Sequence, residues 1–132
     1  MFFLLMLSGL VTLQSPCYKV KLKVLIPQTE QEKVVGLSKT KNLRPNKGML
    51  FKFDHEDQYI FNMKNTSIPL TLFFFDREFR LIEKRTFEPF DPRPIYSKPN
   101  CQYILETNPK VASDTNSFPL FNTKLELEHE SG

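Results

Sequence analysis

Apolar and polar residues alternate along two segments near the ends of this chain. Residues 18–26 carry apolar side chains at every second position, with three lysines between them. Residues 124–130 alternate in the same way, with glutamates at the polar positions. A period of two is typical of a β-strand with one buried and one solvated face. We predict two terminal strands with solvated charged faces, which lysine–glutamate pairs stabilise if the strands are neighbours; a membrane-binding patch is the alternative role for the lysine row.

Further apolar segments are bounded by turn residues and predict the remaining strands. Residues 68–75 are apolar at almost every position, which is typical of a central strand covered on both faces. The polar residues 76–80 turn this segment into residues 81–85, so the two form a predicted hairpin. Residues 88–99 contain four prolines and predict a surface loop, because proline removes a backbone donor. Shorter strands are predicted at residues 49–53, 59–63 and 102–106.

Two short helices are predicted from residues that are typical of helix ends. Thr29 and Glu32 have the spacing of a capping box, in which each side chain accepts a hydrogen bond from the other residue's backbone N–H. Gly36 is placed to end that helix, and Asn108 followed by Pro109 predicts a single helical turn. The fold class expected from all elements is all-β with one or two short helices, as a compact two-sheet β-sandwich or a flattened barrel.

The composition indicates one sheet-rich globular domain. The chain has 132 residues with 13 Phe and no Trp, and a chain of this length can bury a core without metal or disulfide support. The net charge is +3, and the basic residues are interspersed with acidic ones. We therefore predict no nucleic-acid groove, which requires a basic stripe. His55 and His129 have no second ligand at metal spacing, so we predict no metal site and no cofactor.

The first 16 residues resemble the hydrophobic part of a secretory signal. Residues 1–13 carry no charge but are shorter than the ~20 residues that span a bilayer as a helix. We predict export to the periplasm or cell envelope, a domain at residues 17–132, and no transmembrane helix after signal processing. Lipid anchoring at Cys17, retention of the segment and a start codon placed too early are the alternatives. Cys17 and Cys101 allow one disulfide in an oxidising compartment, and two free thiols are the other possibility.

A polar turn lies between two apolar segments at Lys64, Asn65 and Thr66. An ammonium, an amide and a hydroxyl together suit a carboxylate, a phosphate or sugar hydroxyls. In the structural alternative, Asn65 and Thr66 close the turn through backbone bonds, and Lys64 pairs with Asp76 or Glu106. The candidate ligand-binding residues are Lys64, Asn65, Thr66, Asp76, Tyr96 and Glu106.

Several short motifs follow one another along the chain. They are Gly36-Leu37, Gly48-Met49-Leu50-Phe51-x-Phe53, Met63-Lys64-Asn65-Thr66-x-Ile68-Pro69-Leu70, Asp76, Tyr96-Ser97 and Tyr103-x-Leu105-Glu106. In order and spacing they resemble the bacterial family called domain of unknown function 192, over about residues 20–108. The resemblance implies a compact β-sandwich that is often exported, and no reaction is established for the family.

The chain departs from the family pattern close to the polar turn. Asn62 stands where the family usually has an aromatic residue, and Thr71 stands where it usually has an acid. Phe90 and Pro94 stand in place of a cysteine pair, and Pro109 stands in place of a glycine. The missing acid removes an acid–base role at residue 71, and the missing cysteines remove a staple or thiol chemistry. These departures favour a divergent member that only binds.

We predict that the chain is a non-enzymatic exported binding module. Its polar turn would contact a small anionic or carbohydrate ligand or a peptide. One alternative is a monomeric interaction domain that docks with a protein of the cell envelope. The second alternative is a hydrolase or transferase that uses Lys64 with Asp76 or Glu106, although no nucleophile and base occur in a recognisable frame.

Overall fold

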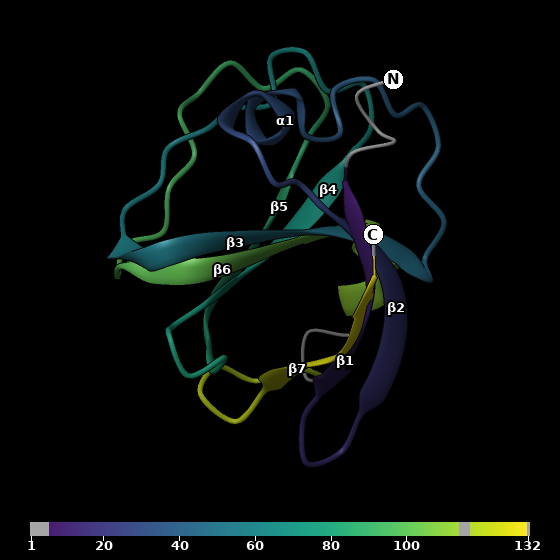
Figure 1. The fold of residues 1–132 in the computed structure, drawn as a ribbon, viewed down its shortest axis with the longest axis vertical. Coiled ribbons are helices and arrows are strands. Elements are labelled where there is room, and N and C mark those ends of the chain that lie inside the picture. Colours follow the sequence, from purple (N-terminus) through teal and green to yellow (C-terminus); the bar gives the residue numbers. More distant parts are fainter. Residues whose placement is uncertain (1–5, 114–116, 132) are drawn as a thin grey trace.

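The computed structural model describes residues 6–113 and 117–131 and shows a mainly β protein (Figure 1). One short α-helix and one 3-10 turn accompany the strands within these residues. The strands are β1 (Leu7–Gln14), β2 (Lys19–Ile26), β3 (Lys47–Asp57), β4 (Leu70–Phe75), β5 (Leu81–Phe87), β6 (Cys101–Thr107) and β7 (Lys124–Ser131); the helices are α1 (Glu30–Val35) and η2 (Pro109–Ala112).

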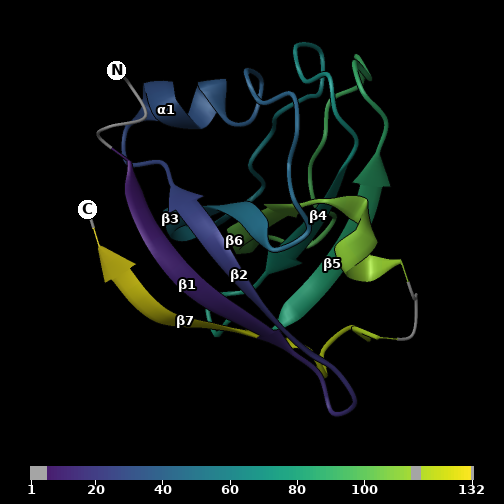
Figure 2. The same cartoon turned by 90° about the vertical axis from the view of Figure 1, so that its right-hand side faces the viewer.

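All seven strands of the described chain belong to one mixed sheet, in the order β5-β4-β6-β3-β2-β1-β7. Only β2 and β3 run parallel, and the other neighbours are antiparallel. The sheet curls into a half-barrel (Figures 1 and 2). The expected two-sheet sandwich is therefore wrong, and the expected mainly β class with short helices is confirmed. A curled sheet buries its inner face against itself, so no second sheet is needed.

The curl brings the beginning of β5 next to the beginning of β7. Arg80 and Lys124 form an isolated antiparallel bridge. The Leu81 N–H donates to the Thr123 carbonyl over 2.9 Å, and the Leu125 N–H donates to the Phe79 carbonyl over 3.0 Å. These bonds join the two outer strands at one end only, which is why the sheet remains a half-barrel.

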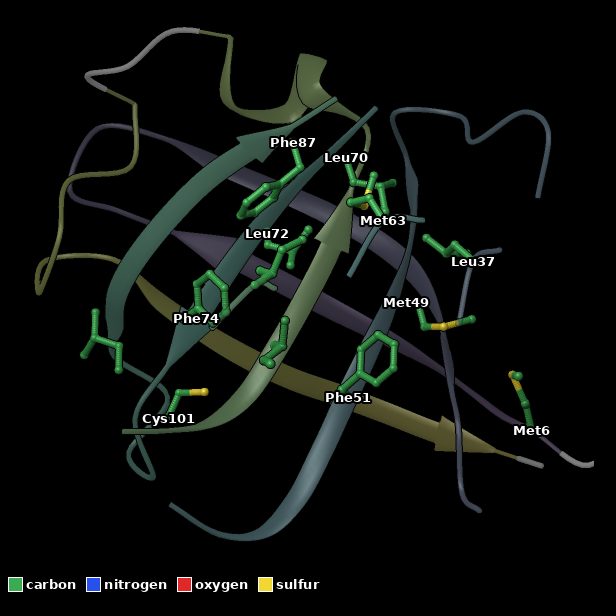
Figure 3. Packing of buried hydrophobic residues seen from close by; sticks show 13 residues of the cluster. Met6, Leu37, Met49, Phe51, Met63, Leu70, Leu72, Phe74, Phe87 and Cys101 are labelled. Atoms are coloured by element: carbon green, nitrogen blue, oxygen red, sulfur yellow. The ribbon is translucent and has the colours of Figure 1, made fainter. Parts of the chain in front are cut away.

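Buried side chains form two clusters, one on each face of the sheet. The cluster inside the curl takes residues from all seven strands and from Phe118. Its members are Val11, Leu13, Leu22, Val24, Ile26, Leu50, Phe73, Phe75, Leu81, Leu105, Phe118 and Leu125. The second cluster takes its strand residues from β3 to β6 and includes Met49, Phe51, Leu72 and Phe74 (Figure 3). Because both faces of β4 are apolar, this strand contributes to both clusters, as its sequence predicts.

Helix α1 lies in the crossover between the parallel strands β2 and β3, over the outer face of the sheet (Figure 1). The predicted capping box is confirmed, because the Thr29 hydroxyl accepts from the Glu32 N–H and the Glu32 carboxylate accepts from the Thr29 N–H. Gly36 follows the helix with φ +48°, a conformation that glycine adopts at low cost. The predicted turn capped by Asn108 is also confirmed as η2.

One prediction about strand placement is wrong, and one condition is not met. Residues 59–63 form a loop, held by a single bridge between Phe61 and Ile95. The terminal strands β2 and β7 are not neighbours, because β1 lies between them (Figure 2). Lys21 and Glu128 nevertheless form an ion pair across β1, with Nζ and Oε2 3.8 Å apart.

Strand β1 consists of residues from the segment predicted to be an export signal. It pairs with β2 and β7 along its length, and its Val11 and Leu13 side chains are fully buried. Cys17 is exposed, Cys101 is buried, and both are free thiols. Within the residues that the structure covers, no helix combines the length and the apolar character needed to cross a bilayer.

A chain that begins at Cys17 is predicted not to fold. It lacks β1, so β7 loses its strand partner and β2 loses one of two neighbours. We expect a chain of residues 17–132 to show no cooperative thermal transition by far-ultraviolet circular dichroism. A chain of residues 6–132 retains every residue of β1 and serves as the control, with a wild-type transition. A cooperative transition in the shorter chain at the same temperature would contradict the role given to β1.

Candidate functional site

A cavity of about 440 Å³ lies between α1, the strands β3 and β6, and the loop before β4. This size is typical of pockets that hold small molecules. Its walls combine apolar and polar groups, with the apolar part somewhat larger. The lining side chains discussed below are Glu30, Lys33, Val34, Phe51, Phe53, Tyr59, Phe61, Asn62, Asn65, Ile104 and Glu106.

Two glycines shape the cavity. At Gly48, an added Cβ would lie 2.7 Å from the Glu106 carbonyl oxygen, so only glycine lets β3 approach β6 this closely. The close approach places Glu106 of β6 opposite Met49 of β3. At Gly36, which also lines the cavity, an added Cβ would lie 3.6 Å from the Phe51 ring. The sequence motifs around both glycines therefore position the walls of the site.

Glu106 is the buried polar group of the cavity. Its strand neighbours are Met49 on β3 and Leu72 on β4, and only 6% of the residue is exposed. No described residue donates a hydrogen bond to its carboxyl group or forms an ion pair with it. Desolvation by burial raises the pKa of Glu106 to about 8, because an apolar environment disfavours the charged form. The carboxyl group is therefore mostly protonated at neutral pH.

Aromatic rings and one lysine also line the cavity. The Phe53 and Tyr59 rings are stacked with centroids 3.6 Å apart, and the Tyr59 hydroxyl donates to the His55 carbonyl. Lys33 of α1 places its Nζ 4.8 Å from the Phe53 ring centroid and 3.7 Å from the Glu30 carboxylate. The lysine charge is thus shared between an aromatic face and an acid of its own helix.

Two asparagines lie at the exposed side of the cavity. The Asn62 Oδ1 accepts from the Lys64 backbone N–H over 2.9 Å, which fixes the start of the polar turn. Asn65 lines the cavity and is exposed. These amides offer hydrogen bonds to a ligand that extends out of the cavity toward water.

The structure brings together two of the six residues predicted to form the site, Asn65 and Glu106. Lys64 is exposed, but it does not line the cavity. Thr66 is buried, and its backbone is bound on both sides: its N–H donates to the Met63 carbonyl and its carbonyl accepts from the Phe90 N–H, each over 3.0 Å. Thr66 therefore holds the proline-rich loop against the turn.

The remaining two predicted residues lie away from the cavity. Asp76 closes the turn between β4 and β5: its carboxylate accepts from the backbone N–H groups of Glu78 and Arg80 and pairs with the Arg80 side chain. Tyr96 is 44% exposed, and its carbonyl accepts from the Arg85 guanidinium. Ligand binding by the full predicted set stays a prediction.

The sequence analysis did not select Lys33, Phe53 or Tyr59. Lys33 lies on the predicted helix and Phe53 on a predicted strand, but no local pattern shows that helix and strand face each other. One signal for Glu106 was present, because it alternates with the apolar Ile104 on the same strand and so shares a buried face. Within the described residues, no group of three or more His, Cys, Asp or Glu side chains is placed to hold a metal ion.

The burial of Glu106 makes protein stability depend on pH. The pKa is about 8 in the folded protein against an ordinary value of 4.5, so the folded state retains a proton that the unfolded state loses. The stability contributed by the neutral carboxyl is complete below pH 4.5 and is lost as the pH rises through 8. We predict that a Glu106→Gln variant gains about 1.4 kcal/mol per pH unit relative to wild type between about pH 5 and 8.

Urea unfolding of both proteins at pH 5, 6, 7, 8 and 9 measures this difference. Glu126→Gln on β7 is the control, because it makes the same substitution at an exposed residue. A pH-independent difference between wild type and Glu106→Gln would show that Glu106 is not buried as described.

Comparisons with known proteins agree with this fold. A crystal structure from Sinorhizobium meliloti 1021, named a "putative transcription regulator", is 24% identical, with a TM-score of 0.83 over 91% of this chain and 93% of that one. A protein of unknown function from Novosphingobium aromaticivorans DSM 12444 is 25% identical, with a TM-score of 0.82 over 90% of this chain and 84% of that one. No curated protein matches this chain. The family model of domain of unknown function 192 (DUF192; Uncharacterized ACR, COG1430) matches residues 11–117, and the chain belongs to this family.

Proposed function

We propose that this domain is a non-enzymatic binding module that takes a small ligand into the cavity between α1 and the strands β3 and β6. The observation that carries the proposal is Glu106, a residue that is only 6% exposed, lines the cavity and has no hydrogen-bond or ion-pair partner for its carboxyl group among the described residues. A buried polar group without a partner destabilises a fold. Its presence in an aromatic-walled cavity is understandable if a ligand supplies the missing partner.

The surroundings of Glu106 favour binding over catalysis. The other charged side chains of the cavity are Glu30 and Lys33, which pair with each other. General acid–base or nucleophilic chemistry needs a second group positioned beside the first. Lys64, the residue expected to act with Asp76 or Glu106 in a hydrolase or transferase, does not line the cavity, and neither does Asp76. The cavity thus offers a place to bind and a single proton-carrying group.

We also propose that the domain works after export, as a monomer in the periplasm or cell envelope. The uncharged residues 1–13 support this location. The structure adds a condition, because Leu7–Gln14 forms β1. Any processing of the chain must therefore leave residues 7–14 attached to the domain.

A small-molecule thermal-shift screen on the full chain tests the binding proposal. A ligand at 100 times its Kd stabilises the folded state by about 2.7 kcal/mol, which raises the melting temperature by several degrees. Val34 lies at the cavity with 85% of its surface exposed, so Val34→Trp should block the cavity without disturbing the core. We expect compounds that stabilise wild type to have no effect on this variant.

Leu25→Trp is the matched control, because Leu25 is an exposed apolar residue that does not line the cavity. It should keep the wild-type response to every compound. Lys64→Ala distinguishes a ligand site in the cavity from one at the polar turn. If the ligand binds in the cavity, this variant should respond to the compounds as wild type does. If Lys64→Ala loses the response and Val34→Trp keeps it, the ligand binds at the polar turn and the cavity proposal is wrong. A screen in which no compound stabilises the wild type would also contradict the proposal.

A further inference from the structure

The Glu106 carboxyl group reaches the surface of the cavity. Glu106 lines the cavity and is 6% exposed, and its carboxyl group has no partner among the described residues. In the same part of the chain, the unpartnered side-chain oxygens that are completely enclosed belong to Thr12 and Glu32. The Glu106 oxygens are not in this group, so they keep accessible surface. A molecule in the cavity can therefore contact the carboxyl group directly.

The side chains next to Glu106 on the sheet are apolar. Residues directly opposite each other on neighbouring strands share a face, and Glu106 lies opposite Met49 on β3 and Leu72 on β4. Ile104, two residues away on β6, lies opposite Phe51, and both of these side chains line the cavity. None of the four neighbours offers a charge or a strong hydrogen bond. The sheet around Glu106 is therefore apolar apart from the carboxyl group itself.

The carboxyl group is neutral in this environment. Burial raises the pKa of Glu106 to about 8, so the group keeps its proton at neutral pH. A protonated carboxyl group has an O–H donor and a carbonyl acceptor side by side. A partner that satisfies both must also present an acceptor and a donor side by side. It must be neutral as well, because apolar surroundings disfavour an unbalanced charge.

We infer that the cavity binds a neutral primary carboxamide, whose carbonyl oxygen accepts from the Glu106 O–H and whose N–H donates to the Glu106 carbonyl oxygen. This inference rests on the proposed binding function and names its ligand class. A ketone or an ester accepts one bond and leaves the Glu106 acceptor without a donor. A carboxylate brings a net charge into apolar surroundings. A carboxamide makes both bonds and adds no charge.

The mouth of the cavity indicates that the rest of the ligand is apolar. Val34 on α1 and Ile60 on the loop before β4 both line the cavity, and they are 85% and 70% exposed. Exposed apolar residues at a cavity are typical of binding sites. A carboxamide that carries an aromatic group can place its amide at the sheet and its ring against these side chains.

The two hydrogen bonds make affinity depend on pH. With the pKa of Glu106 at about 8, about 99% of the carboxyl groups are protonated at pH 6 and about 9% at pH 9. The ionised form lacks the donor, so carboxamide affinity should fall about tenfold between these values. The other titratable side chains of the cavity are Glu30 and Lys33 on α1 and Tyr59 on the loop before β4. The β3 and β4 neighbours of Glu106 do not titrate.

Isothermal titration calorimetry of the full chain tests the inference with matched probes. Benzamide and 3-phenylpropanamide are the carboxamides. Acetophenone and 4-phenylbutan-2-one have a methyl group in place of the amide nitrogen and are acceptors only, and benzoate and 3-phenylpropanoate are the anions. At pH 6 we expect the carboxamides to bind about tenfold or more tightly than the ketones and the anions, because these leave a buried group unpaired or a charge unbalanced. Val34→Trp should lose this binding.

Two substitutions assign the preference to Glu106. Glutamine keeps a donor and an acceptor side by side and does not titrate, so Glu106→Gln should keep the preference for carboxamides and lose its pH dependence. Methionine fills a similar space without these groups, so Glu106→Met should bind carboxamides and ketones equally. The two variants give separate readouts, so Glu106→Gln tests the inference even if Glu106→Met impairs folding.

The outcomes separate the ligand class from the binding function. If the ketones or the anions bind wild type as tightly as the carboxamides, and Val34→Trp abolishes that binding, the ligand class is wrong and the binding module stands. The ligand class is also wrong if Glu106→Met keeps the preference, if Glu106→Gln keeps the pH dependence, or if the wider screen yields ligands while the carboxamides do not bind. If neither these probes nor the wider screen stabilise the wild type, the binding function itself fails.

Discussion

The organisation of this protein depends on one sheet that has two apolar faces. The inner face buries itself by curling, with side chains from all seven described strands in one cluster. The outer face cannot close in this way, so α1, the loop before β4 and the proline-rich loop must cover it. This cover is built from a helix of six residues and irregular chain. The cavity lies under this cover, with Glu106 at the sheet.

Contacts outside the cavity help to hold the proline-rich loop in place. Arg85 of β5 pairs with Glu83 over 2.6 Å and packs over the Phe87 ring, with the guanidinium carbon 5.1 Å from its centroid. Its guanidinium also donates to the Tyr96 carbonyl, so β5 and this loop are tied together. Phe61 also holds this loop through its bridge to Ile95, and Phe61 lines the cavity, so the cover and the cavity share this residue.

Local patterns in the sequence predicted those elements whose stability is local. The capping box of α1, the alternation of β2 and the doubly apolar β4 all depend on residues close together in the chain. The order of strands depends on long-range pairing, which no local pattern encodes, so the sequence left a two-sheet sandwich and a flattened barrel open where the structure has a half-barrel. The loop at residues 59–63 was mistaken for a strand because Tyr59 and Phe61 pack on the outer cluster while Ile60 remains 70% exposed.

The same limit applies to the site. The polar turn was predicted to be the binding site because its residues are polar. The polar group that the cavity buries is instead an acid on the buried face of a strand. Glu106 was among the predicted residues, but its role depends on α1 and the aromatic loop, which reach it only in the folded chain. The central claim is that the Glu106 carboxyl group is buried without a partner. Carbon-13 NMR titration of its side-chain carboxyl measures this directly: the structure predicts a pKa of about 8, and a midpoint near the ordinary value of 4.5 would contradict it.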